Sequence, residues 1–139
     1  MSDDTFHTRE QVYASAVFAQ ITPLISEDEP TRKAYGSLAH KLPVLIRTAG
    51  LAQSLAFVQA RNKEGTPQRM LLNDLEVVLQ VSGILTANTR LVERSRTASF
   101  EEYMRLTEGA LEALLWFKRF AQSELKVQSG AESQEDSHA

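Results

Sequence analysis

The segment that most constrains the fold spans residues 41–61, with the sequence KLPVLIRTAGLAQSLAFVQAR. At about 100° per residue, its apolar side chains spread around most of a helix, too widely for an amphipathic surface helix. Pro43 would fall in the first turn, where a missing N–H has no intrahelical partner to lose. The sequence therefore predicts one helix over residues 41–61, buried on nearly every side and surrounded by other helices.

One stripe of this predicted helix is not apolar. Its members are three, four and seven residues apart and so lie close to one line: Arg47, Gly50, Ser54 and Arg61. A glycine inside a helix costs about 1 kcal/mol relative to alanine, so Gly50 indicates a close approach to the backbone. Packing of another helix is favoured from this stripe alone. The alternative is a groove in which a nucleic-acid backbone lies between two arginines.

Recognisable start and stop signals accompany the other apolar segments. Thr8 and Gln11 form a capping-box pattern that opens the first helix, and Pro23 predicts that this helix kinks there or ends just before it. A short second helix is expected to stop ahead of Pro43, because the residue before a proline is pushed out of the helical region. Ser99 and Glu102 repeat the capping-box pattern at the start of the last helix.

Every apolar pattern has three- and four-residue spacing, and no alternating run is flanked by hairpin turns. The predicted fold class is all-α: a single-domain bundle of five to six helices around a central buried helix, without a sheet. Apart from the central one, the expected helices begin at residue 8 and cover residues 31–40, 68–85 and 100–126, with a helical turn or two possible in residues 86–99.

The length of 139 residues and the 42% hydrophobic content suit one domain. We expect a flexible N-terminal arm over residues 1–7, a helical domain over 8–126, and a disordered tail rich in Ser, Glu and Gln over 127–139. The absence of cysteine excludes disulfides and thiol chemistry. No apolar run is long enough to span a bilayer, so we expect a cytoplasmic protein that does not contact membranes.

The net charge of −3 hides a strong segregation along the chain. Residues 30–69, which we call the basic island, hold seven basic residues against one acidic residue. Such clustering predicts a local surface that binds a polyanion; the alternative is an ordinary solvated face. Within the island, Arg61 is a nucleic-acid-binding candidate because it belongs to the arginine stripe, and Lys63 is one because it follows two residues later.

Two aromatic residues, Trp116 and Phe120, fall on the side of the last predicted helix away from its main apolar face. Large aromatics outside the core stripe are candidates for a contact with another subunit. The alternative, that a loop or another helix of the same chain covers them, is equally compatible with the pattern.

No constellation of catalytic residues stands out. The histidines lack the spacing of metal ligands, and no phosphate-binding loop or nucleophile elbow is present. Acidic residues inside apolar stretches are predicted to be exposed surface: Asp74, Glu76, Glu108 and Glu112. We therefore expect no catalytic residue, no metal and no cofactor.

Two motifs resemble those of a known family, over residues 13–121. The first is Tyr35-x-Ser37-Leu38-Ala39-x-Lys41-Leu42-Pro43-x-x-Ile46-Arg47-x-x-Gly50-Leu51, ending at Ala56-Phe57. The second is Thr107-Glu108-x-Ala110-Leu111 with Trp116-x-Lys118-Arg119-Phe120. Together they are similar to the signature of the small subunit of the Cmr effector complex, the type III-B CRISPR ribonucleoprotein.

The resemblance implies a small, all-helical, non-catalytic protein of antiviral defence. It implies that a few copies stack head to tail beside the backbone subunits that hold the guide RNA, and that they contact the target RNA paired to it. The implied partners are thus other Cmr subunits, further copies of the chain, guide RNA and target RNA. Matching the motifs adds nucleic-acid-binding candidates: Lys41, Arg47, Lys118 and Arg119. A helical protein–protein adaptor that never touches nucleic acid is the alternative function.

Overall fold

The computed structural model describes residues 6–128 and is all-α, which confirms the predicted fold class. That part of the chain contains no β-strand. In chain order, the elements are α1 (Arg9–Ile21), the 3₁₀ helix η1 (Thr22–Ser26), α2 (Glu29–Ala49), α3 (Leu51–Arg61), α4 (Pro67–Val81), α5 (Leu91–Thr97) and α6 (Phe100–Ser123).

The two helix starts predicted from capping patterns, at Thr8 and Ser99, are confirmed. The Thr8 hydroxyl accepts from the backbone N–H of Gln11 at 3.0 Å, and the Gln11 side chain accepts from the backbone N–H of Thr8 at 2.8 Å, which completes the capping box. The hydroxyl of Ser99 caps α6 by accepting from the N–H of Glu102 at 3.2 Å. Helix α1 ends at Ile21, before Pro23, as that residue predicted.

The prediction of a helix break before Pro43 is wrong. Helix α2 runs without interruption from Glu29 to Ala49 and carries Pro43 in its interior, where the ring is buried. An interior proline costs about 3 kcal/mol because it removes a hydrogen bond and crowds the preceding turn. Helix α2 packs against α6, α4, α3 and η1, and this packing offsets the cost.

The helix break lies instead at Gly50, so residues 41–61 belong to two helices and not to one. Gly50 has φ 90° and ψ 160°, ends α2 by donating its N–H to the Ile46 carbonyl at 2.9 Å, and precedes the first residue of α3. The predicted straight stripe from Arg47 to Arg61 is therefore also wrong. Nor is the segment buried on nearly every side, since Val44 and Phe57 are about half exposed, at 58% and 49%.

The close approach predicted at Gly50 comes from a side chain of the same protein. A Cβ built on Gly50 would lie 3.2 Å from the hydroxyl of Tyr103 on α6. That hydroxyl accepts a hydrogen bond from the N–H of Ala52 at 3.1 Å, in the first turn of α3. The interpretation that another helix packs at this point is the correct one. Ser54, also of the stripe, is buried at 2% exposure.

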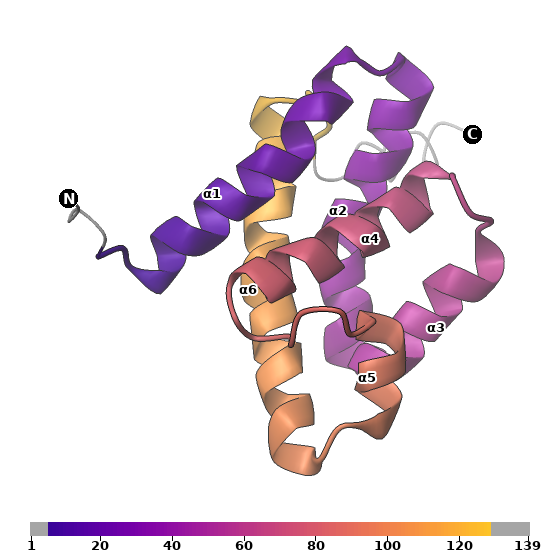
Figure 1. The fold of residues 1–139 in the computed structure, drawn as a ribbon. Coiled ribbons are helices and arrows are strands. Elements are labelled where there is room, and N and C mark those ends of the chain that lie inside the picture. The colour runs from indigo at the N-terminus through magenta and orange to yellow at the C-terminus, as the bar shows by residue number, and fades with distance from the viewer. Residues whose placement is uncertain (1–5, 129–139) are drawn as a thin grey trace.

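Helices α2 and α6 run side by side through the centre, and α1 and α4 cross them (Figure 1). The rings of Tyr35 on α2 and Phe117 on α6 lie 6.5 Å apart between centroids and are fully buried. Helix α3 leaves the end of α2 at an angle, so that α2 and α3 form a V on one side of the bundle (Figure 1). The central helix is therefore α2, whose centre lies about ten residues before that of the predicted helix.

Beyond α6 the chain folds back onto α2. Val127 is buried, at 6% exposure, and its side chain lies where a Cβ on Gly36 would sit, at 2.6–2.8 Å. A ring nitrogen of His40 lies 3.1 Å from the Val127 carbonyl oxygen. The predicted tail boundary at 127 thus leaves out a residue that packs against the core. The rest of the predicted tail, residues 129–139, and residues 1–5 of the predicted arm lie outside the described residues.

Candidate nucleic-acid interface

The two arms of the V formed by α2 and α3 enclose a groove of about 690 Å³. We call it the basic groove because Lys33 and Lys41 of α2 face Arg61 of α3 across it, and none of the described residues that line it is acidic. Its other lining residues are Pro30, Ala34, Ser37, Leu38, Leu45, Phe57, Val58, Asn62 and Gln68.

The cations of the basic groove are spaced along its length. Lys33 and Lys41 are eight residues apart on one helix, a rise of about 12 Å, and therefore point to similar sides of α2. On the opposite wall, the guanidinium of Arg61 lies 5.0 Å from the ring centroid of Phe57, a cation–π contact that holds the arginine over the aromatic face. The groove thus combines fixed positive charge with a half-exposed aromatic ring.

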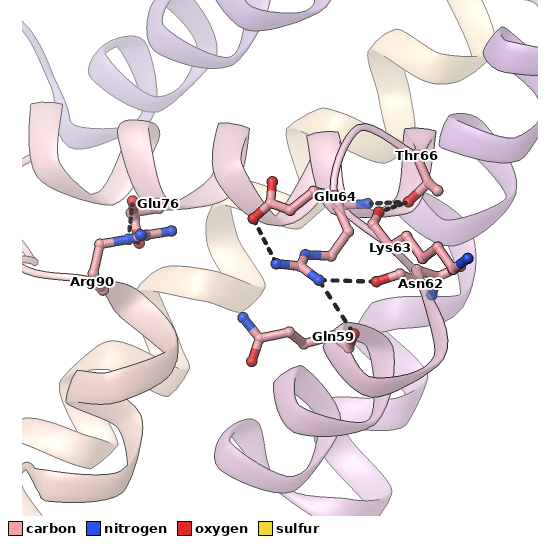
Figure 2. Close-up of polar contacts among 8 residues, drawn as sticks. Gln59, Asn62, Lys63, Glu64, Thr66, Glu76 and Arg90 are labelled. Carbon is pink, nitrogen blue, oxygen red and sulfur yellow. Dashed lines mark hydrogen bonds and ion pairs between the residues drawn. The ribbon is translucent and has the colours of Figure 1, made fainter.

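Not every cation of the basic island is a candidate for binding. Arg69 donates to the carbonyl oxygens of Asn62 and Gln59 at 2.9 and 3.4 Å, and it pairs with Glu64 at 2.8 Å. Figure 2 shows these three partners converging on one guanidinium, while the Lys63 side chain points away from them. The Arg69 side chain is only 16% exposed. It fixes the turn between α3 and α4.

Of the predicted nucleic-acid-binding residues, only Lys41 and Arg61 line the basic groove. Arg47 and Lys63 are exposed but lie outside the residues that line the basic groove. On α6, Lys118 is partly buried and Arg119 is exposed. Whether any of them contacts RNA stays a prediction.

Sequence reasoning missed two members of the groove. Lys33 was counted only as part of the basic island, although its spacing to Lys41 on a continuous helix would have put both on one side. Phe57 was assigned to the buried helix, whereas its ring lies beside Arg61. The prediction of a helix break before Pro43 placed Lys33 and Lys41 on different helices, so their position on one side of α2 was not recognised.

The aromatic pair on α6 is half covered by the chain itself. Phe120 meets Phe18 of α1 edge-on, with ring centroids 5.3 Å apart, and Trp116 lies 5.6 Å from Phe120. Both are partly buried and pack against the core. Trp116 also lines a hollow of about 440 Å³ between α1 and α6, beside Arg9 and Glu112. The contact with another subunit stays a prediction for the part of this surface that α1 leaves exposed.

The acidic residues of α4 have structural partners, which corrects their prediction as exposed surface. Asp74 is partly buried and accepts from the Tyr35 hydroxyl at 2.6 Å; burial raises the pKa of its carboxyl to about 6. Glu76 accepts from the N–H of Leu91 at 2.7 Å and pairs with Arg90 at 3.1 Å (Figure 2). Both carboxylates join α4 to neighbouring segments.

Residues 6–128 hold no group of three or more His, Cys, Asp or Glu side chains placed to bind a metal ion. Among the helices described, none has the length and apolar character needed to span a bilayer.

Comparisons with known proteins agree with one another. Residues 9–124 match the family model described as CRISPR-associated protein (Cas_Cmr5). The chain is 41% identical, over 116 residues, to the CRISPR system Cmr subunit Cmr5 of Thermus thermophilus, an alignment that covers 84% of this chain and 95% of that protein. Its fold is similar to the X-ray crystal structure of a CRISPR-associated Cmr5 family protein from the same organism, with a TM-score of 0.71 and 38% identity. That alignment covers 86% of this chain and 99% of the other.

Proposed function

Because this chain belongs to the Cmr5 family of CRISPR-associated proteins and is a subunit of a Cmr-type complex, we propose that it acts there as a non-catalytic RNA-contacting subunit. In this role the basic groove holds part of the guide–target RNA. The same molecule contacts further copies of itself and other subunits through surfaces outside the groove.

The observation that supports RNA contact most directly is the convergence of Lys33, Lys41 and Arg61 on one groove without a lining carboxylate among the described residues. The phosphates of a nucleic acid carry one negative charge each, and lysine and arginine neutralise them with release of counterions. Phosphate contacts of this kind position a strand but carry no sequence information. This matches a subunit of a complex whose guide RNA supplies the specificity.

The aromatic ring of Phe57 adds a second type of contact. An exposed ring beside an arginine can stack on an unpaired base, and such stacking tolerates any sequence. Phe57 is 49% exposed and lies against Arg61. The groove therefore suits an RNA strand whose phosphates follow α2 while one base approaches α3.

A non-catalytic role agrees with the chemistry of the described residues. Nuclease chemistry needs clustered carboxylates or histidines, commonly around a metal ion. The two most enclosed carboxylates of α4, Asp74 and Glu76, are engaged by Tyr35 and by Arg90 and Leu91. Their roles are structural, and neither lines the basic groove.

The test of RNA contact compares two double charge reversals of the full chain. Lys41→Glu with Arg61→Glu changes the groove, and Arg47→Glu with Lys63→Glu makes the same change in charge on exposed residues outside it. Affinity for RNAs of unrelated sequence is measured over a salt series, with circular dichroism to check the fold. We expect the groove variant to lose affinity by about tenfold or more, with a shallower salt dependence, while the control loses much less.

Equal losses in both variants would show that the basic island acts as diffuse charge, which contradicts the groove. Unchanged binding in the groove variant, or no RNA binding by the parent chain with binding to one protein partner, would favour the helical adaptor instead.

Contact with other subunits is tested at Trp116 alone, because Phe120 also packs against Phe18 inside the molecule. Trp116→Ala should weaken co-purification with Cmr subunits or further copies of the chain and lower the thermal unfolding midpoint only modestly, because the Trp116 ring is only partly buried, against Phe120. A large drop in that midpoint would assign Trp116 to the core.

A further inference from the structure

The described part of the chain ends beside the basic groove. After α6, residues 125–128 line a hollow of about 320 Å³ together with Glu29, Arg32 and Lys33 from the start of α2. Lys33 lines this hollow and the basic groove alike. Burial of Leu125 and Val127 fixes the path of the chain up to this point. The residues that follow Gln128 therefore start at one end of the groove.

The charge of those residues is complementary to the groove. Residues 129–139 contain three acidic side chains and no lysine or arginine: Glu132, Glu135 and Asp136. The groove presents three basic side chains and no lining carboxylate among the described residues. Opposite charges attract, and the attraction is screened by salt.

Residues 129–139 are also long enough to reach along the groove. An extended chain spans about 3.3 Å per residue, so the eight residues that follow Gln128, up to Asp136, reach about 26 Å from it. The two lysines of the groove are only about 12 Å apart along α2. A short tether gives its two ends an effective concentration in the millimolar range, so even weak ion pairs form a substantial population.

We propose that residues 129–139, here called the acidic segment, dock in the basic groove and compete with RNA for it. The docking stands on the position of Gln128 and on charge; the competition rests on the proposed function. In this arrangement the carboxylates occupy the places of RNA phosphates at Lys33, Lys41 and Arg61. The segment would then lower binding to weak polyanions and be displaced by the RNA of the assembled complex.

Docking is tested without RNA by disulfide trapping, which is clean because the chain has no cysteine of its own. One variant pairs Ser133→Cys with Ser37→Cys, a groove residue. The control pairs Ser133→Cys with Ala87→Cys, an exposed residue of the α4–α5 loop. A disulfide requires Cα atoms within about 7 Å. We expect the groove pair to cross-link about tenfold faster at low salt, and high salt to abolish the difference. Equal rates at low salt would overturn the docking.

Competition is tested by neutralising the segment in the full chain. Glu132→Gln, Glu135→Gln and Asp136→Asn together should raise the affinity for an unstructured RNA about threefold to tenfold at low salt, since exposed ion pairs are individually weak. The matched control replaces Glu10, Glu101 and Glu108, exposed on α1 and α6, by Gln and gives the same change in net charge. An equal gain in the control would reduce the effect to net charge and overturn the competition.

The cross-linking rate and the RNA affinity together distinguish the docking from the proposed function. Preferential cross-linking in a chain that binds no RNA would overturn the proposed function and support the docking. RNA binding that depends on Lys41 and Arg61, with equal cross-linking rates, would support the proposed function and overturn the docking.

Discussion

Two helix-breaking residues seven positions apart, Pro43 and Gly50, behave in opposite ways. Pro43 lies inside α2, which continues through it, whereas Gly50 ends α2 and starts α3. Local propensity alone ranks proline as the stronger breaker by about 2 kcal/mol. The comparison shows that the break falls where the surrounding structure needs a turn and not where propensity is poorest.

The difference has a physical cause in the neighbours of each residue. Around Pro43, the buried positions Ala39, Leu42 and Ile46 pack against other helices and hold α2 straight enough to continue. At Gly50, the backbone adopts φ 90° and ψ 160°, a region that is essentially open to glycine alone. A proline can be tolerated by packing, but this conformation cannot be adopted by an ordinary residue without strain.

The geometry of the basic groove depends on which of these two residues ends the helix. A continuous α2 carries Lys33 and Lys41 on one wall, and the break at Gly50 turns α3 so that Arg61 stands on the other. A helix break before Pro43 would instead have placed Lys33 and Lys41 on different helices.

The largest expected effect comes from Gly50→Ala. Strain at this φ and ψ, added to crowding against the Tyr103 hydroxyl 3.2 Å away, should lower the free energy of unfolding by about 3 kcal/mol and the midpoint by about 10 °C. Thermal unfolding measures it. Gly65→Ala is the control, with φ +86° and nothing within 4 Å of the added Cβ. An equal loss in both variants would remove the Tyr103 contact from the explanation.

Asp74→Asn tests the hydrogen bond from Tyr35 to Asp74 that anchors α2. Tyr35 lies eight residues before Pro43. Burial raises the folded-state pKa of Asp74 to about 6, above its ordinary value of 3.8. Between about pH 4 and 6, Asp74 is therefore still protonated in the folded state but already ionised in the unfolded state. The parent chain consequently loses stability as pH rises from about 4 to 6. The variant should be more stable by about 2 kcal/mol at pH 7.5, and the difference should vanish near pH 4.

Asp28→Asn provides a control of opposite sign for that pH series. Hydrogen bonds from the side chain of Thr31 and from its backbone N–H lower the pKa of the Asp28 carboxyl. The contribution of Asp28 to stability is therefore present at neutral pH and lost as pH falls through the lowered value. If urea unfolding shows the same pH trend for both variants, the assignment of the slope to Asp74 is wrong.

Tyr103→Phe should weaken the break at Gly50 from the other side. The substitution leaves the N–H of Ala52 without its acceptor in the first turn of α3. A part-buried donor that loses its partner costs about 1 kcal/mol. Urea unfolding measures the loss, and hydrogen exchange at Ala52 should speed up. Unchanged exchange at Ala52 would show that the hydroxyl does not hold this turn.

The smallest effect is expected for Pro43→Ala. Alanine restores a backbone donor inside α2 and relieves the crowding of the ring, but it removes buried ring carbons. The opposing terms leave a net gain of less than about 1 kcal/mol in the free energy of unfolding. Pro30→Ala is the control, because Pro30 lies in the first turn of α2, where the missing N–H is tolerated. A loss of stability at Pro43 would mean that the ring is needed for packing.

The sequence by itself determined the fold class, the helix starts at Thr8 and Ser99, and the family. Caps such as Thr8 with Gln11, and the turn at Gly65 and Pro67, act through neighbours three to five residues away, so they can be recognised without a fold. The motifs around Lys41 and Trp116 were likewise visible in the chain and led to the family that the comparisons bear out.

Only the tertiary structure decided which charges stand together. Lys33, Lys41 and Arg61 share a groove because α2 continues through Pro43 and the chain turns at Gly50, and both outcomes depend on contacts with α4 and α6. Arg69 and Asp74 acquired structural roles through partners that local patterns do not identify. Hydrogen bonds at caps are local in sequence, whereas the packing that offsets a proline, and the tyrosine that meets a glycine 53 residues away, exist only once the chain is folded.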